Sequence, residues 1–382
     1  MKTFLPLFLS LCLFVASTEA QYSSSQKARV QVSGYIKDLQ WLRIEHQPSM
    51  STYTHLLHQR LNTHWRIGKG WSARAELRTR FFYGSDVERQ PSFAETLSRE
   101  QEGEKLFLQP VIQDESVLHI NTERLYLDYS NAVMNFRAGR QRINWGMNNS
   151  WNPNDIFNTY NLLDFDYEER PGRDAVRWQY SIDEQTGVEC ALASGKSRPT
   201  GAMKLHTHLR TYDLQLLAGI YDGRASIGFG WAGNIHEVGF KGEAQWYNGT
   251  MLRDQSLNIS TEFDYMTSSG WYFLLSGLYN RNGKNSPLPA TAFASIGIQP
   301  ENPMPGRWNV LGSVAKEINP FIGFTVSFIH APGVQLSAFT PSVRFSYIDN
   351  LDFDLIVQAF SWQEADHQRF SETLFFRARY SF

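Results

Sequence analysis

Apolar and polar residues alternate along much of this chain with a period of two residues. The pattern is clearest near residue 382, where one face carries Leu374, Phe376, Ala378, Tyr380 and Phe382. The opposite face carries Thr373, Arg377, Arg379 and Ser381, with Phe375 as its apolar exception. Successive side chains of a β-strand point to opposite faces, so this segment is predicted to be a strand with one apolar and one polar face.

The same alternation recurs at 71–81, 237–246, 257–265, 342–347 and 351–358. A soluble β-sandwich also alternates in this way. Two details favour a membrane barrel instead. Aromatic residues lie near the strand ends, as in the girdles of membrane barrels, and the strands run to about 10–14 residues, which suits a tilted bilayer crossing.

Counting the alternating segments gives about 18 strands, an even number as such barrels require. The predicted strands are 28–42, 53–66, 71–83, 117–129, 133–145, 172–182, 187–194, 201–211, 213–222, 224–233, 236–248, 255–266, 270–282, 307–316, 320–331, 335–348, 351–363 and 369–382. The weakest are 187–194 and 201–211, and without that hairpin the count is 16. The fold class is therefore all-β, a single transmembrane antiparallel barrel.

Starting in the periplasm, the connections between these strands alternate between the two sides of the membrane. The short ones are predicted at Gly68-Lys69-Gly70, Ser130-Asn131, Asp183–Thr186, Gly233–Ile235, Ser268-Ser269 and Asp349-Asn350, and the long ones at 84–116, 146–171 and 283–306. Short periplasmic turns and long external loops are the asymmetry of outer-membrane barrels. No separate plug domain is expected, so only the long loops remain to narrow the pore by folding inward.

Residues 1–20 have the features of a secretory signal peptide: Lys2, a short apolar core, and small residues before a cut after Ala20. The barrel is then 21–382. No later segment holds about 18 consecutive apolar residues, and only helices and closed barrels satisfy every backbone group in lipid. We therefore expect the mature chain in the bacterial outer membrane.

Composition excludes several other classes of function. The formal net charge is −2, which gives no reason to expect nucleic acid as a partner. Removal of the signal peptide leaves Cys190 as the single cysteine, so neither a disulfide framework nor a cysteine metal site is predicted. The segment from Gly228 to Gly233 matches a dinucleotide-binding pattern but lies in a strand and opens no helix. No cofactor is expected.

The polar strand faces are predicted to line the lumen. Arginines crowd the earlier strands and carboxylates the later ones; the candidate pore-lining residues are Arg74, Arg78, Arg80, Arg124, Arg177, Glu262 and Asp264. Separated charges on a pore wall set up a field that orients and filters polar solutes. The alternative is that they form interstrand salt bridges that only hold the barrel together.

The most distinctive stretch runs from Gly139-Arg140-Gln141-Arg142 through Asn152-Pro153-Asn154-Asp155 to Arg170-Pro171-Gly172. Residues 139–178 resemble porin-like outer-membrane proteins of the alginate-export type and related barrel families. The resemblance implies solute passage, with a constriction to which Arg140, Arg142, Asn154, Asp155 and Arg177 contribute. Alginate itself does not follow, because the lumen is not overwhelmingly basic. The acidic residues Asp164, Asp166, Glu168 and Glu169 are interpreted as a solvated loop rather than a metal site.

The sequence thus predicts a porin-like channel, not an enzyme, that passes small polar or charged solutes. A surface barrel that binds glycan or capsule and a barrel-embedded lipid hydrolase stay open as alternatives. Expected partners are outer-membrane lipid, lipopolysaccharide and the barrel assembly machinery, for which Tyr380 and Phe382 resemble the recognition signal. Whether the barrels associate into a homo-oligomer is left open.

Overall fold

A computed structural model describes residues 29–46, 49–90, 92–99, 106, 111–113, 115–158, 172–195, 197–251, 253–288, 298–364 and 367–382. The predicted signal peptide and the acidic segment from Asp164 to Glu169 lie outside these residues. The elements are β1 (Val30–His46), β2 (Ser49–Gly68), β3 (Trp71–Gly84), α2 (Ser85–Arg89), α3 (Phe93–Arg99), β4 (Val111–Gln113), β5 (Ser116–Ser130), β6 (Met134–Gln141), β7 (Arg173–Ser181), β8 (Thr186–Ala193), β9 (Thr200–Leu209), β10 (Tyr212–Tyr221), β11 (Arg224–Ile235), β12 (Val238–Tyr247), β13 (Ser256–Met266), β14 (Trp271–Asn280), β15 (Trp308–Asn319), β16 (Ile322–Ala331), η2 (Pro332–Val334), β17 (Leu336–Ile348), β18 (Leu351–Glu364) and β19 (His367–Ser381).

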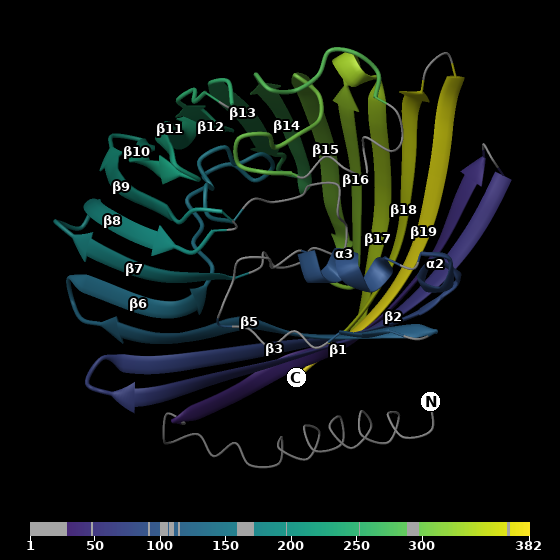
Figure 1. Cartoon of the computed structure of the whole chain (residues 1–382), viewed down its shortest axis with the longest axis horizontal. Helices are drawn as coiled ribbons and strands as arrows, with labels where there is room; N and C mark the ends of the chain where they lie inside the picture. The colour runs from purple at the N-terminus through teal and green to yellow at the C-terminus, as the bar shows by residue number, and fades with distance from the viewer. Residues whose placement is uncertain are drawn as a thin grey trace.

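The strands form one antiparallel sheet that closes on itself (Figure 1). β1 pairs with β2 on one edge and with β19 on the other, and Gly34 and Phe382 exchange two backbone hydrogen bonds of 2.9 Å at this closure. The sheet has 19 strands, of which the three-residue β4 pairs with the beginning of β5. The remaining 18 form the wall. The predicted all-β, 18-stranded, single-domain barrel is confirmed, including the doubtful hairpin of β8 and β9.

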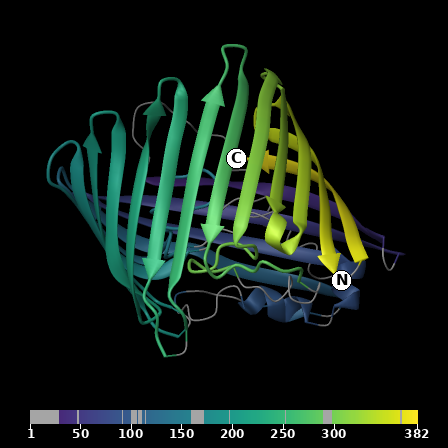
Figure 2. The same ribbon diagram turned by 90° about the horizontal axis from the view of Figure 1, so that it is seen from above.

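The connections at one end of the barrel are all short, and the long connections all lie at the other end (Figure 2). We call these the turn end and the loop end; the connections β3–β5, β6–β7 and β14–β15 are at the loop end. Several predicted strand boundaries differ from the structure, and two of the differences affect the turns and loops. The turn expected at Gly233–Ile235 lies at His236, which has a positive φ of 55°, because β11 continues to Ile235. β6 was expected to reach residue 145 but ends at Gln141.

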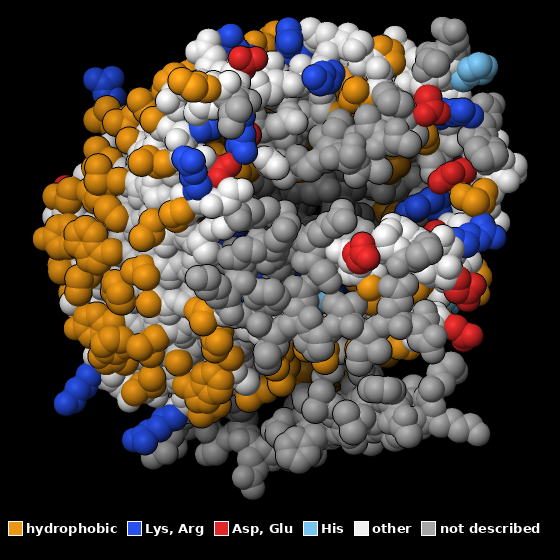
Figure 3. All heavy atoms as spheres, in the orientation of Figure 1, with side chains coloured by type: hydrophobic (Ala, Val, Ile, Leu, Met, Phe, Trp, Pro, Cys, Tyr) orange, Lys and Arg blue, Asp and Glu red, His pale blue; other side chains and the backbone are white. Residues whose placement is uncertain are grey.

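The outside of the wall is apolar. Exposed leucine, isoleucine, valine and phenylalanine side chains occur on nearly every strand, and Figure 3 shows them gathered over the side formed by β6–β10. Aromatic pairs mark the two edges of this belt: Trp71 contacts Tyr129 at the turn end, and Tyr279 contacts Trp308 at the loop end. A closed barrel with an apolar outer belt and aromatic girdles is suited to a bilayer. Among the described residues, no helix is long and apolar enough to cross a membrane.

The inside is mostly polar, but apolar clusters occur where loops pack against the wall, and one of them is at the loop end. There Leu39, Leu56 and Val117 of the wall pack against Val87 of α2 and Leu97 of α3. Figure 1 shows these two helices lying across the opening. Phe375, which breaks the polar pattern of the last strand, packs against the same cluster. Apolar residues are therefore placed on the inner face where a loop covers them.

Candidate functional site

A segment of the β6–β7 connection enters the barrel because β6 stops early. Gly139 has a φ of +121°, and a Cβ at this position would lie 2.3 Å from the carbonyl oxygen of Leu125 on β5. Only glycine fits this bent, close approach. Two residues later, the side-chain amide of Gln141 donates to the carbonyl of Ala175 on β7 at 2.9 Å. The Gly-Arg-Gln strand end thus directs residues 142–158, which we call the constriction loop, into the lumen.

Glu243 of β12 anchors the constriction loop through its backbone. The carboxylate accepts hydrogen bonds from the backbone N–H groups of Met147 at 2.5 Å, Asn148 at 3.0 Å and Asn154 at 2.8 Å. Its side chain is fully buried. A carboxylate bound by several N–H groups forms charge-assisted hydrogen bonds, which are stronger than neutral ones.

Glu262 of β13 likewise anchors the backbone of the constriction loop, at Asn149 and Ser150. It accepts from the backbone N–H of Asn149 at 2.9 Å, and from the backbone N–H and hydroxyl of Ser150 at 3.0 and 2.6 Å. Ser260, beside it on the same strand, accepts from the amide of Asn148 at 2.6 Å and donates to the carbonyl of Trp151 at 3.0 Å. Glu262 was predicted to line the pore, but its carboxylate is buried beneath the loop.

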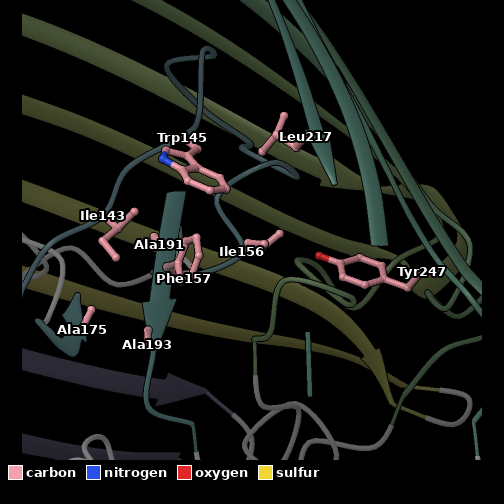
Figure 4. Packing of buried hydrophobic residues seen from close by; sticks show 9 residues of the cluster. All are labelled: Ile143, Trp145, Ile156, Phe157, Ala175, Ala191, Ala193, Leu217 and Tyr247. Carbon is pink, nitrogen blue, oxygen red and sulfur yellow. The ribbon is translucent and has the colours of Figure 1, made fainter. Parts of the chain in front are cut away.

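An apolar cluster fixes the other half of the constriction loop. Figure 4 shows Trp145, Ile156 and Phe157 gathered against Ala191 of β8 and Leu217 of β10. Trp145 meets Phe157 edge to face with ring centroids 4.9 Å apart, and its indole N–H donates to Glu189 of β8 at 2.8 Å. The carbonyl of Trp145 accepts from the amide of Gln215 at 2.8 Å. Both apolar and polar contacts thus hold this loop against β8–β14.

Two glycines of β11 make room for the loop. A Cβ on Gly228 would lie 2.0 Å from Oε1 of Gln245 and 2.6 Å from Oδ1 of Asn154, and one on Gly230 would lie 2.9 Å from the sulfur of Met147. These are the glycines of the segment that matches a dinucleotide-binding pattern. Their role here is to keep the inner wall free of side chains where the loop packs.

A second segment, residues 298–307 before β15, also packs against the inner wall. Here the wall supplies donors: the amide of Asn258 donates to the carbonyl of Pro300 at 2.9 Å, and that of Asn280 to the carbonyl of Met304 at 2.5 Å. Asn309 donates to the carbonyl of Gly306 at 2.8 Å. Wall carboxylates therefore hold backbone N–H groups of one loop, and wall amides hold backbone carbonyls of the other.

The wall formed by β1, β2, β3 and β5 is basic. Its buried cationic residues are Lys37, Arg60, Arg78, Arg80 and Arg124. Its buried carboxylates are those of Glu76, Glu123 and Asp128, so the cations exceed the carboxylates by two charges. Arg78 pairs with Glu123 at 2.7 Å, and Arg60 and Arg74 both pair with Glu76. Arg80 lies 3.0 Å from Nδ1 of His119. Interstrand salt bridges therefore form on this wall, and the buried residues still leave an excess of positive charge.

The remaining predicted site residues are divided between the wall and the constriction loop. Asn154 and Asp155 are buried in the loop and Arg142 is half-buried at its start. Arg140 is fully buried and pairs with Asp174 at 3.4 Å, Arg177 lies 3.9 Å from Glu189, and Asp264 pairs with Lys241 at 3.2 Å.

The anchors Trp145, Gln215, Asn258, Asn280 and Asn309 were missed as site residues, and so was the role of Glu243. Amides repeated on neighbouring polar strand faces were the available signal. Within the described part of the chain, no cluster of three His, Cys, Asp or Glu residues could hold a metal ion. The acidic segment considered for a cation lies outside that part.

Comparison of the sequence with models of protein families gives no match, and neither does comparison with curated proteins. Solved structures do match. OccAB4 of Acinetobacter baumannii has a TM-score of 0.59 at 8% identity, covering 94% of this chain and 100% of that one. OccK7 (OpdD) of Pseudomonas aeruginosa has a TM-score of 0.58 at 9% identity, covering 93% and 99%. OccK1 (OpdK) of the same organism has 0.57 at 8% identity, covering 92% and 98%. The chain has the barrel fold of these outer-membrane proteins over their whole length.

Proposed function

We propose, on the premise of this shared fold, that the protein is a channel of the bacterial outer membrane through which small polar solutes pass the constriction loop. The Occ barrels with the same fold are outer-membrane channels and not enzymes. The observation that carries the proposal is the attachment of residues 147–154 to Glu243 and Glu262. A loop bonded to the inner wall by buried carboxylates gives a pore of fixed width rather than an open cylinder.

The charges of the lumen support a preference for anions. Glu243 and Glu262 accept hydrogen bonds from backbone N–H groups of the constriction loop, and these donors offset the negative charge of the two carboxylates locally. The basic wall of β1–β5 keeps its excess of positive charge. A solute that passes between the loop and this wall therefore meets a positive potential, which raises the local concentration of anions.

Planar bilayers test both statements. Purified, folded protein is expected to give discrete conductance steps, and a potassium chloride gradient is expected to give a reversal potential that favours chloride. The substitution Arg80→Gln removes one positive charge from the wall and should lower the chloride preference, on the order of twofold at low salt. Lys316→Gln is the matched control, because Lys316 stacks on Trp271 outside the lumen. Absence of conductance steps would contradict the channel itself.

The finer predictions rest on sequence alone. The motif in residues 139–178 supports a relation to alginate-export-type barrels, and Tyr380 and Phe382 support recognition by the assembly machinery. A glycan-binding barrel would retain labelled glycan without conducting, and a lipid hydrolase would release fatty acid from phospholipid. Both assays can be run on the protein prepared for the bilayer measurements, so the three functions are separable in one preparation.

A further inference from the structure

Four polar residues interrupt the lipid-facing side of β1 and β2. They are Asp38, Gln40, His55 and Gln59, which we call the outer polar patch. Lys37 and Leu39 flank Asp38 and are buried in the lumen, whereas Leu42 and Ile44 lie an even number of residues away from it and are exposed on the outside. Asp38 and Gln40 therefore face outward. On β2, exposed Tyr53 and Trp65 place the odd-numbered residues His55 and Gln59 on the same outer side.

The patch extends from the middle of the membrane belt at Gln59 toward the loop-end edge, where His55 is two residues from Tyr53. Gln59 is six residues from Trp65 near the turn end and six from Tyr53 near the loop end. The residue paired with Gln59 on β1 is Ile36. Asp38 is the next outward-facing residue of β1 after Ile36, toward the loop end. An ionisable side chain at this depth is costly when it faces hydrocarbon, and such residues in membrane proteins usually have a protein partner.

Contacts within the chain satisfy the patch only in part. Gln40 donates to Asp38 at 2.9 Å. His55 stacks on Tyr83 with ring centroids 4.7 Å apart, and makes no hydrogen bond with the described residues. Gln59 is 3% exposed, and neither atom of its amide has a hydrogen-bond partner in the described structure. A carboxylate acceptor and an unmatched amide donor thus lie on neighbouring strands at about the same depth.

We propose that the outer polar patch is the contact between two copies of this chain, related by a two-fold axis along the membrane normal between β1 and β2. Both copies must have the same orientation in the membrane, so the axis preserves depth and exchanges the two strands. Asp38 of each copy then lies opposite Gln59 of the other. Because Gln59 is covered by its neighbours in the single copy, its side chain must rotate outward for its amide to donate to that carboxylate, and the pair then forms twice. A self-complementary patch of this kind favours a second copy over a different polypeptide.

Oligomeric state in lipid nanodiscs, measured by native mass spectrometry, tests the proposal. The wild-type protein is expected to be a dimer. Asp38→Leu should weaken the dimer at least tenfold while the monomer keeps or gains heat stability, because a carboxylate leaves the lipid face. Asp38→Asn keeps the size of the side chain and should weaken the dimer less than Asp38→Leu does. Leu216→Ala, at an exposed outward position on β10, is the control that should leave the dimer intact.

Cross-linking with the polar patch unchanged supplies a second measurement. In a Cys190→Ser background, Leu57→Cys should give a disulfide-linked dimer in membranes, since Leu57 is the register partner of Asp38. Leu216→Cys should not. A monomeric wild-type protein, a trimer, or a dimer unaffected by Asp38→Leu would overturn the proposal. Bilayer conductance of the same samples distinguishes this failure from failure of the channel function, on which the interface does not depend.

Discussion

The carboxylate of Glu243 accepts a hydrogen bond of 2.8 Å from the backbone N–H of Asn154, and so joins the wall to the constriction loop. We expect Glu243→Gln to loosen this loop, because a neutral amide is a weaker acceptor and accepts through one oxygen only. The free energy of unfolding should fall by about 2 kcal/mol, the scale of a hydrogen bond to a charged group. Bilayer recordings should show a larger and noisier conductance.

A control for Glu243→Gln is Glu184→Gln, which removes the same charge from an exposed turn between β7 and β8. It should leave both conductance and stability unchanged. Equal conductance in the two variants would show that the loop is held without Glu243.

Gly228→Leu should displace the constriction loop from the inside of the wall. An added Cβ would lie 2.6 Å from Oδ1 of Asn154, and the rest of a leucine side chain would need the space that the loop occupies. We expect single-channel conductance to rise by about twofold or more, because the displaced loop no longer narrows the lumen at this wall. Gly312→Leu is the matched control on β15: nothing lies within 4 Å of its added Cβ, and its conductance should equal that of the wild type.

Gly139→Ala should prevent β6 from bending inward. The added Cβ would meet the carbonyl of Leu125 at 2.3 Å, and a φ of +121° is unfavourable for alanine. We expect a loss of about 2 kcal/mol or more in the free energy of unfolding, measured by urea titration of the detergent-solubilised barrel. Gly277→Ala is the comparison, because the nearest atom to its Cβ is 3.8 Å away. If both variants unfold at the same urea concentration, the bend does not require glycine.

The turn between β7 and β8 should become less ordered in acid. Backbone N–H groups of Gln185 and Thr186 donate to Asp183 at 2.8 and 2.7 Å and lower the pKa of its carboxyl below 3.8. Stability from these bonds is therefore complete above the unfolded pKa of 3.8 and is lost as the pH falls through the lower folded value. Hydrogen exchange at the two amides, corrected for intrinsic rates, should accelerate only in that acid range. Asp183→Asn should remove the pH dependence.

The wall could be predicted from the sequence, and the loops inside it could not. Alternation is a local signal, and it located even β8 and β9, where the evidence in the pattern is weakest. Glu262 shows the limit: its alternation correctly places it on the inner face, but only the three-dimensional fold shows that the loop covers it. Phe375 shows the converse, since an apolar residue on the polar face indicates a covering segment without saying which one.

The end of β6 is an intermediate case. The Gly-Arg-Gln motif was identified as distinctive, yet the apolar residues Ile143 and Trp145 continued the alternation and extended the predicted strand to 145. In the structure these two side chains belong to the cluster formed by the inward loop. An apolar side chain buried against the inner wall and one facing lipid look the same in a pattern of hydrophobicity.

The contacts of the constriction loop also set an order of assembly. Met147 and Glu243 are 96 residues apart in sequence, and Asn149 and Glu262 are 113 apart. The constriction loop is therefore not held in place by its neighbours in sequence. Until β12 and β13 are part of the sheet, the loop lacks the two carboxylates that bind its backbone, so it can reach its final position only after these strands have paired.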